Sequence, residues 1–289
     1  MLSVLIVSWN TRELLQSCLK SIYLYPPSGE FEVIVVDNDS TDQSAEMVSA
    51  NFPLVQLIHE TKNRGYAQGN NRAFSFATGN WLVTLNPDTE VNSGCFDNAI
   101  QALSDLTHYG ALGIRQMGVD GKIQRSVRGF PTLRGIIGDA LGLAGARPNS
   151  GWDSYRLTGF DYTLAQPAPQ PMGTFLLFRR SALEAVGDSK NPFDNLFPIF
   201  FNEVDLLFRL YEAGWPCWYT PEVSILHHGG ESTKQVRKSM IWESHRSLVR
   251  YLRKHYGTTA NALGLGILSA LILSAAFVRA RGYHAGFRT

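Results

Sequence analysis

Three segments rich in carboxylates and amides stand beside apolar runs of this chain. In order they are Asp37-Asn38, Asn86-Pro87-Asp88 and Asn202-Glu203-Val204-Asp205. A buried parallel strand is a short apolar run, and ligands of open α/β sheets bind beyond the carboxyl ends of such strands. Carboxylates in that place can bind a hard divalent cation or take a proton from a substrate. The pattern therefore predicts one ligand site built from the ends of several strands.

The elements that position these segments alternate between strand and helix. We expect helices between the first three strands and over residues 69–77 and 204–211, where apolar residues recur at helical spacing. The alternation predicts a mostly parallel sheet with right-handed crossovers. After Gly110 the pattern loosens, and we expect an insertion there. The strands that we expect span 2–7, 31–36, 55–58, 81–85, 174–178 and 223–226.

Composition limits the class of protein. A chain of 289 residues with 44% hydrophobic residues can bury one large core, or a core plus a smaller appendage. Its formal net charge of +1 argues against nucleic acid as a partner. The three cysteines are far apart and predict buried thiols rather than disulfides or a zinc site. The chain opens directly into an apolar strand, so we expect no export signal and a cytoplasmic protein.

The three segments, in this order, resemble motifs of family 2 glycosyltransferases, which have a GT-A fold. The resemblance covers about residues 1–250, and Asn86-Pro87-Asp88 is similar to the rhamnosyltransferase-like branch, where Asn replaces the first acid of Asp-x-Asp. It implies an α/β fold with a mostly parallel central sheet flanked by helices. A glycosyltransferase domain would span 1–256, with a nucleotide-sugar half over about 1–110 and an acceptor half over about 111–256.

The resemblance also implies an activity. The enzyme would move a sugar, with rhamnose suggested by the branch, from a nucleoside-diphosphate sugar to a hydroxyl of a glycan or polyprenyl-linked glycan, with inversion. Asp37 would accept the imide hydrogen of the base, although an Asp there could instead cap the next helix. Ser8 and Asn10 would lie in a loop that wraps the nucleotide, and the run over 63–71 would line the donor diphosphate. Gly173 would leave room for the sugar. The donor-binding residues that the resemblance implies are Ser8, Asn10, Asp37, Asn63, Gly65, Asn70, Asn86, Asp88 and Gly173.

A divalent cation, Mg²⁺ or Mn²⁺, would bind Asp88 and neutralise the donor diphosphate. His227 opens a run over 227–232 that matches the His-x-x-Gly-x-Ser of the family. It would complete the metal site or contact the diphosphate. Two alternatives stay open, because Asn-Pro-Asp is also a common turn and His227 could be a core histidine.

The third segment, over residues 202–205, departs from the family pattern. Glu203 stands where the catalytic Asp is found, and Asn202 replaces the preceding Glu. We expect Glu203 to be the general base, because a Glu can serve if its pKa is not raised too far. Asp205 is the competing candidate, and otherwise an acid near the positive end of a helix.

Two arginines in the expected acceptor half, Arg125 and Arg128, lie in a stretch that resembles a Ser-x-Arg-x-Phe-Pro-Thr segment of the family. They either bind a phosphate of the acceptor or are solvated surface residues.

The C-terminal segment 257–289 would hold an apolar helix and a basic tail. Residues 257–278 carry no charge and are long enough to span a membrane. The helix is either membrane-embedded or interfacial, or it packs on protein. We expect it to attach the enzyme to the cytoplasmic face of the cell membrane, where a polyprenyl-linked acceptor would be found.

Two rival functions are weighed against this one. A sugar nucleotidyltransferase would have a Gly-rich loop after its first strand, where this chain has residues 8–12 without glycine. A catalytically impaired glycan-binding or scaffold protein is suggested by Asn86 and Asn202, which replace acids.

Overall fold

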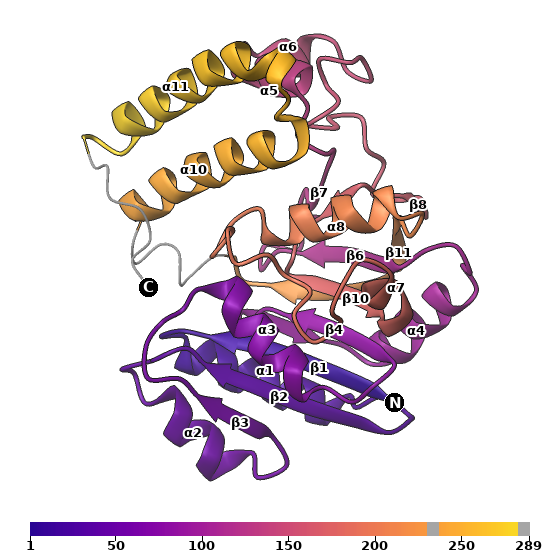
Figure 1. The fold of residues 1–289 in the computed structure, drawn as a ribbon. Coiled ribbons are helices and arrows are strands. Elements are labelled where there is room, and N and C mark those ends of the chain that lie inside the picture. The colour runs from indigo at the N-terminus through magenta and orange to yellow at the C-terminus, as the bar shows by residue number, and fades with distance from the viewer. Residues whose placement is uncertain (230–236, 283–289) are drawn as a thin grey trace.

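The computed structural model of the chain describes residues 1–229 and 237–282. In this part of the chain, nine strands form a central sheet in the order β3-β2-β1-β4-β10-β6-β11-β5, with β8 paired to β11 (Figure 1). A second sheet pairs β7 (Val127–Arg128) with β9 (Gln170–Pro171). The strands of the central sheet are β1 (Leu2–Ser8), β2 (Phe31–Asp37), β3 (Gln56–His59), β4 (Trp81–Leu85), β5 (Thr89–Val91), β6 (Ala111–Met117), β8 (Gln166–Pro167), β10 (Phe175–Arg179) and β11 (Cys217–His227).

Helices cover both faces of the sheet (Figure 1). One apolar cluster joins α1, α2 and α4 to the first face, and another joins α3, α7 and α8 to the second. This arrangement confirms the expected α/β fold with a central sheet flanked by helices. The helices are α1 (Arg12–Leu24), α2 (Ser44–Asn51), α3 (Tyr66–Phe76), α4 (Cys95–Ser104), α5 (Leu133–Ala140), α6 (Leu143–Ala146), α7 (Arg180–Ala185), α8 (Asn202–Glu212), α10 (Arg237–Tyr256), the 3₁₀ turn η1 (Thr259–Asn261) and α11 (Ala262–Arg279).

The parallel part of the sheet places the predicted site residues. All residues of β1 are buried, as expected for a central strand covered on both faces. β1 pairs in parallel with β2 and β4, and its last residue, Ser8, lies opposite Asp37. The carboxyl ends of these three strands therefore meet at one edge.

One expectation about the elements is wrong, and two expected elements have different boundaries. Residues 111–117 do not loosen into an insertion but form β6 in the sheet, between β10 and β11. Gly113 interrupts its apolar run because Pro171 approaches so closely that a Cβ would lie 2.5 Å from the proline Cβ. Helix α3 begins at Tyr66, three residues before the expected start at 69, and β11 extends well before the expected strand over 223–226.

The chain ends in a hairpin of α10 and α11 that the sequence pattern did not predict as a pair. A third apolar cluster joins it to the globular part through residues of α5, α8 and α10, including Ile136, Val204 and Tyr251. Figure 1 shows α11 beside α5 and α6, far from the N-terminal strands. The division of the chain at residue 256 stays a prediction.

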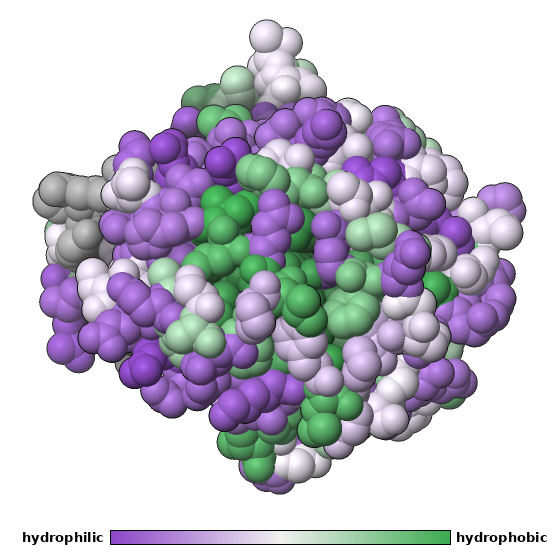
Figure 2. Space-filling view, turned by 90° about the horizontal axis from the view of Figure 1, so that it is seen from below, coloured by the Kyte–Doolittle hydropathy of each residue, from purple (hydrophilic) through white to green (hydrophobic). Residues whose placement is uncertain are grey.

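The exposed surface of α11 in this hairpin is apolar. Within the described residues, the segment Thr259–Arg279 is long and apolar enough to cross a membrane, with a mean hydropathy of 2.0 and only 22% of it buried. The face of the molecule seen from below in Figure 2 differs from the surface of α11, because polar side chains surround its central apolar area.

Candidate active site

Asp37 ends β2 with a fully buried side chain. Its Oδ2 accepts hydrogen bonds from the Ser40 amide at 3.2 Å and from Nδ1 of His59 at 3.1 Å. Its Oδ1 has no hydrogen-bond partner among the described residues. Helix α2 begins only at Ser44, so Asp37 does not cap it. Because buried carboxylate oxygens are seldom left unpaired, Oδ1 is suited to accept an N–H from a ligand.

The loop after β1 is tied to the loop after β2. Asn10 has a positive φ of 51°, and its Oδ1 accepts from the Thr41 amide at 2.8 Å. The backbone N–H of Asn10 donates to Oγ of Ser40 at 3.0 Å. Ser8 is buried, and its hydroxyl bonds to that of Thr11 at 2.9 Å. These contacts hold the predicted nucleotide loop against the end of β2.

Asn38 organises the site, although sequence reasoning assigned it no role. Its Nδ2 donates to Oδ1 of Asn63 at 2.8 Å and to the Gly65 carbonyl at 3.2 Å. Its Oδ1 accepts from the Arg64 amide at 3.0 Å. Asn38 therefore joins the predicted diphosphate-binding run to the end of β2. Its place directly after Asp37 was the only signal for it.

Gly65 links this run to the segment before α8. Its φ is +87°, and a Cβ at this position would lie 2.5 Å from the Pro198 carbonyl oxygen. The same carbonyl accepts from the Ala67 amide at 3.0 Å. A side chain at Gly65 would therefore be strained and would also displace the segment that leads to Glu203.

Tyr66 is a second residue that sequence reasoning missed. Its hydroxyl lies 3.1 Å from Oδ1 of Asn86 and 3.2 Å from the carbonyl oxygen of Gly173. Burial and the nearby charge of Glu203 raise the pKa of Tyr66, so this hydroxyl stays protonated and donates. Tyr66 thus connects the Asn-Pro-Asp turn to the predicted sugar pocket. Asn70, one turn later, donates from Nδ2 to the Tyr66 carbonyl at 2.9 Å.

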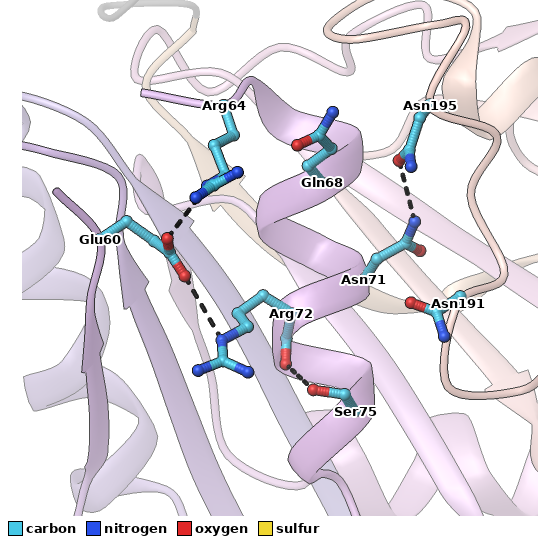
Figure 3. Close-up of a pocket in the computed structure, with 8 residues that line it drawn as sticks. All are labelled: Glu60, Arg64, Gln68, Asn71, Arg72, Ser75, Asn191 and Asn195. Carbon is cyan, nitrogen blue, oxygen red and sulfur yellow. Dashed lines mark hydrogen bonds and ion pairs between the residues drawn. The ribbon is translucent and has the colours of Figure 1, made fainter. Parts of the chain in front are cut away.

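A polar cavity of about 490 Å³ lies against a different face of α3 (Figure 3). Glu60 pairs there with Nε of Arg64 at 3.2 Å and of Arg72 at 3.4 Å. At its other wall, Asn71 exchanges hydrogen bonds with the backbone N–H and C=O of Phe193. Together with Gly65, Asn71 therefore fixes the segment that precedes α8.

Asp88 and His227 meet because β5 pairs with β11, with Thr89 opposite His227. Oδ2 of Asp88 lies 3.5 Å from Nε2 of His227, and both side chains are buried. Two adjacent ligands of an octahedral Mg²⁺ at 2.0–2.1 Å lie about 3 Å apart, so the pair fits one hard cation after a small adjustment. The described residues contain no cluster of three or more His, Cys, Asp or Glu suited to a metal. Phosphate oxygens and water would complete the shell.

His227 is held in one orientation by Gln124. Its Nδ1 donates to Oε1 of Gln124 at 2.7 Å, and Nε2 of Gln124 donates to the His227 carbonyl at 3.0 Å. With the proton on Nδ1, the neutral ring presents Nε2 toward Asp88. The rest of this motif, residues 230–232, lies outside the described residues.

Glu203 lies in the first turn of α8 and packs against Gly173, where a Cβ would lie 3.6 Å from the Glu203 side chain. Burial raises the pKa of Glu203 to about 7. Asn202 is fully buried, and its Oδ1 accepts from the Glu203 amide at 2.7 Å. The two asparagines that replace family acids, Asn86 and Asn202, therefore both make hydrogen bonds within the site.

Asp205 lies two residues later in the same first turn of α8, but in a different environment. Its carboxylate contacts Nε of Arg209 at 2.9 Å, Nζ of Lys254 at 2.6 Å and Nε2 of His255 at 2.8 Å. Burial alone would raise the pKa of Asp205, but the bond from His255 and the charges of Arg209 and Lys254 hold it below its ordinary value. Asp205 thus ties α8 to α10.

Comparisons with known proteins identify the family of the chain. The profile described as "Glycosyl transferase family 2" matches residues 3–187. An N-acetylglucosaminyl-diphospho-decaprenol L-rhamnosyltransferase of Mycobacterium tuberculosis is 30% identical over 242 residues, which cover 78% of this chain and 76% of that protein. A PGL/p-HBAD biosynthesis glycosyltransferase of Mycobacterium bovis is 33% identical over 91 residues, 30% of this chain and 35% of that protein.

Solved structures support the fold. The chain resembles the mannosyltransferase PcManGT of Pyrobaculum calidifontis, solved with GDP-Man and Mn²⁺, with a TM-score of 0.61 at 20% identity over 98% of this chain and 76% of that one. It also resembles residues 1–349 of S. aureus TarS in complex with UDP-GlcNAc, with a TM-score of 0.56 at 18% identity over 98% and 73% of the two chains. The chain therefore belongs to glycosyl transferase family 2 and is a glycosyltransferase of the GT-A fold.

Proposed function

We propose that this glycosyltransferase transfers L-rhamnose from a nucleoside-diphosphate sugar to a hydroxyl of a lipid-linked glycan, with inversion and with Mg²⁺ or Mn²⁺. The observation that carries the mechanism is the position of Glu203, a half-buried acid with a pKa raised to about 7, against Gly173 and near Tyr66. The sugar and the lipid-linked acceptor are suggested by the printed name of the mycobacterial relative.

The donor would bind along the carboxyl ends of β1, β2 and β4. Oδ1 of Asp37 would accept the imide N–H of the base. The segment from Asn63 to Asn70 would face the diphosphate, because the N-terminus of α3 offers backbone N–H groups and a positive dipole end. Asp88 and His227 would hold the cation, which supplies positive charge to the leaving diphosphate.

Glu203 would remove the proton from the acceptor hydroxyl as that oxygen attacks the anomeric carbon from the side opposite the diphosphate. The bond from the anomeric carbon to the diphosphate oxygen breaks, and the electron pair leaves with the nucleoside diphosphate. A base with a pKa near the working pH is both ionised in part and basic enough to accept the proton. One displacement inverts the anomeric configuration.

The exposed face of α11 would lie on the cytoplasmic face of the membrane. Leu265, Ser269, Ile272 and Ala276 are its buried positions, so one side of the helix already packs on protein. The opposite side is apolar and exposed, as for an interfacial helix. Its exposed residues are Leu263 (81%), Ile267 (57%), Leu271 (63%) and Val278 (74%).

The test is release of nucleoside diphosphate from a panel of nucleotide sugars, with a membrane extract or a synthetic lipid-linked glycan as acceptor. We expect release that needs Mg²⁺ or Mn²⁺ and the acceptor, is fastest with the rhamnose donor, and yields an inverted linkage by NMR. Equal rates with and without a chelator would show that the reaction needs no divalent cation. A retained anomeric configuration would exclude a single displacement.

A further inference from the structure

The short strand β7 lies beside β9, and β9 leads to Gly173 next to Glu203, the proposed general base. It pairs in antiparallel register with β9, so that Val127 lies opposite Pro171 and Arg128 opposite Gln170. The pairing continues one step further, because the Met172 amide donates to the Ser126 carbonyl at 2.7 Å. The next residue after Met172 is Gly173, against which Glu203 packs. Residues 125–128 therefore lie along the acceptor side of the proposed reaction centre.

Arg128 and Glu203 are linked through Tyr155. The Arg128 guanidinium lies 5.6 Å from the centre of the Tyr155 ring. The pKa of Tyr155 is raised, chiefly by burial. The charge of Arg128 and its hydrogen bond to Tyr155 oppose this shift, and the charge of Glu203 adds to it. The Tyr155 carbonyl accepts from the Gly129 amide at 3.0 Å, which holds the ring beside β7. Tyr155 is thus within electrostatic reach of both charged groups.

Apart from the contact of Arg128 with Tyr155, several polar groups of this segment have no ion pair or side-chain hydrogen-bond partner among the described residues. Among the described residues, Arg125 and Arg128 make no ion pair, whereas Arg156 pairs with Asp139 at 2.6 Å. Between the two arginines, Ser126 is only 4% exposed, and its Oγ has no hydrogen-bond partner in the described part of the chain. The same holds for Oε1 of Gln170, opposite Arg128. Buried polar atoms without partners are uncommon and indicate a group still to be bound.

We propose that Arg125, Ser126 and Arg128 bind the diphosphate that joins the acceptor sugar to its lipid. Guanidinium groups match phosphate oxygens in bidentate geometry, and a serine hydroxyl adds a donor. An acceptor hydroxyl at Glu203 would leave the diphosphate of the same sugar one ring away, on the side of β7. In Figure 1, β7 lies between the central sheet and the end of the molecule that carries α5 and α11. Lipid, diphosphate and sugar would then follow one another toward the base.

This inference rests on the proposed function and identifies the acceptor by its charge. The test compares two acceptors, a lipid-diphosphate-linked glycan and the same glycan as an uncharged alkyl glycoside. In the double variant Arg125→Gln and Arg128→Gln we expect KM for the diphosphate acceptor to rise at least tenfold. KM for the glycoside and the donor Kd should change less than twofold. Lys20→Gln, which removes an exposed charge from α1 on the other face of the sheet, should leave all three constants unchanged.

Ser126→Ala and Arg128→Lys extend the test if the double variant folds poorly. Arg128→Lys keeps the charge but loses the bidentate geometry, so its KM for the diphosphate acceptor should fall between the wild-type and double-variant values. A double variant that still prefers the diphosphate acceptor as strongly as wild type overturns the arginine site alone. A wild-type enzyme that transfers equally well to both acceptors overturns the diphosphate as a recognised group. A wild-type enzyme that uses neither acceptor overturns the proposed function itself.

Discussion

The donor side and the acceptor side differ in how far their polar groups are already paired. On the donor side, Asn10, Asn38 and Tyr66 each join segments that are distant in the chain through hydrogen bonds near 3 Å. On the acceptor side, Arg125 and Arg128 make no ion pair in the described residues, and α11 exposes large apolar side chains. Buried polar groups are usually paired within the protein, and two that have no partner in the described part of the chain, Oδ1 of Asp37 and Oγ of Ser126, are suited to pair with a ligand. The comparison indicates a preorganised donor pocket and an acceptor surface completed by lipid and substrate.

The strongest test of a preorganised donor side is Asp88→Asn. We expect it to abolish transfer and metal-dependent donor binding while the circular dichroism spectrum and Tm stay near wild type. Loss of the charge removes the stronger ligand of a hard cation but keeps the shape of the side chain. Calorimetric titration of donor with and without Mg²⁺ or Mn²⁺ measures this. Donor affinity that does not depend on metal in either protein would contradict the assignment.

Glu203→Gln should lower kcat at least about a hundredfold and leave the donor Kd nearly unchanged, as expected for loss of a general base. Asp205→Asn is the matched comparison. Because Asp205 pairs with Arg209, Lys254 and His255, its loss should lower stability by about 3–5 kcal/mol, with a smaller direct effect on chemistry. If Asp205→Asn gave the catalytic loss with an unchanged Tm, and Glu203→Gln stayed active, the two roles would be exchanged.

The pH dependence of Glu203 follows from its raised pKa of about 7. Activity should rise with pH through about 7, because only the carboxylate accepts a proton. The contribution of Glu203 to the stability of the fold changes with pH in the opposite direction. The folded state holds the Glu203 proton more tightly than the unfolded state, so the stability this confers is full below the ordinary pKa of 4.5 and is lost as pH rises through about 7. Glu203→Gln should therefore raise Tm relative to wild type at pH 8 but not at pH 4.5, as measured by thermal melts.

Gln124→Leu should weaken Mn²⁺ binding about tenfold to a hundredfold, because it removes the group that orients His227. The measurement is Mn²⁺ titration by electron paramagnetic resonance in the presence of nucleoside diphosphate. Gln116→Leu, a buried glutamine on β6, controls for loss of an amide from the same region. Equal Mn²⁺ affinity in wild type and Gln124→Leu would show that His227 needs no such support or is no ligand.

The smallest effect on chemistry is expected on α11. Changing Leu263, Ile267 and Leu271 together to serine should move the enzyme from the membrane fraction to the soluble fraction and leave Tm and transfer to a soluble acceptor unchanged. Ile272→Ser, on the buried face, should instead lower Tm, because it leaves a cavity in the cluster shared with Tyr251. A wild-type enzyme found wholly in the soluble fraction would contradict the proposed attachment of α11 to the membrane.

Local pattern was sufficient wherever the function rests on a strand end. The apolar runs before Asp37 and Asp88 are short, and Thr84 is the single polar residue within the second, so the strands and the acids that follow them could be predicted from neighbouring residues alone. The apolar run of β6 is broken by Gly113 and is followed by Arg115 and Gln116, and α10 is rich in charged residues, so neither pattern stood out. In both, packing against other parts of the chain outweighs local propensity.

The sequence by itself determined the family, the order of the three acid- and amide-rich segments and the apolar character of the C-terminal helix, because these depend on residue types and short spacings. Only the tertiary structure decided that Asn38, Tyr66 and Gln124 hold the site together, since each bonds to residues 20 or more positions away. It likewise separated Glu203 from Asp205, two acids in the same helical turn. The physical reason is that burial and charged neighbours set the chemistry of an acid, and here α10 brings Lys254 and His255 to one of them alone.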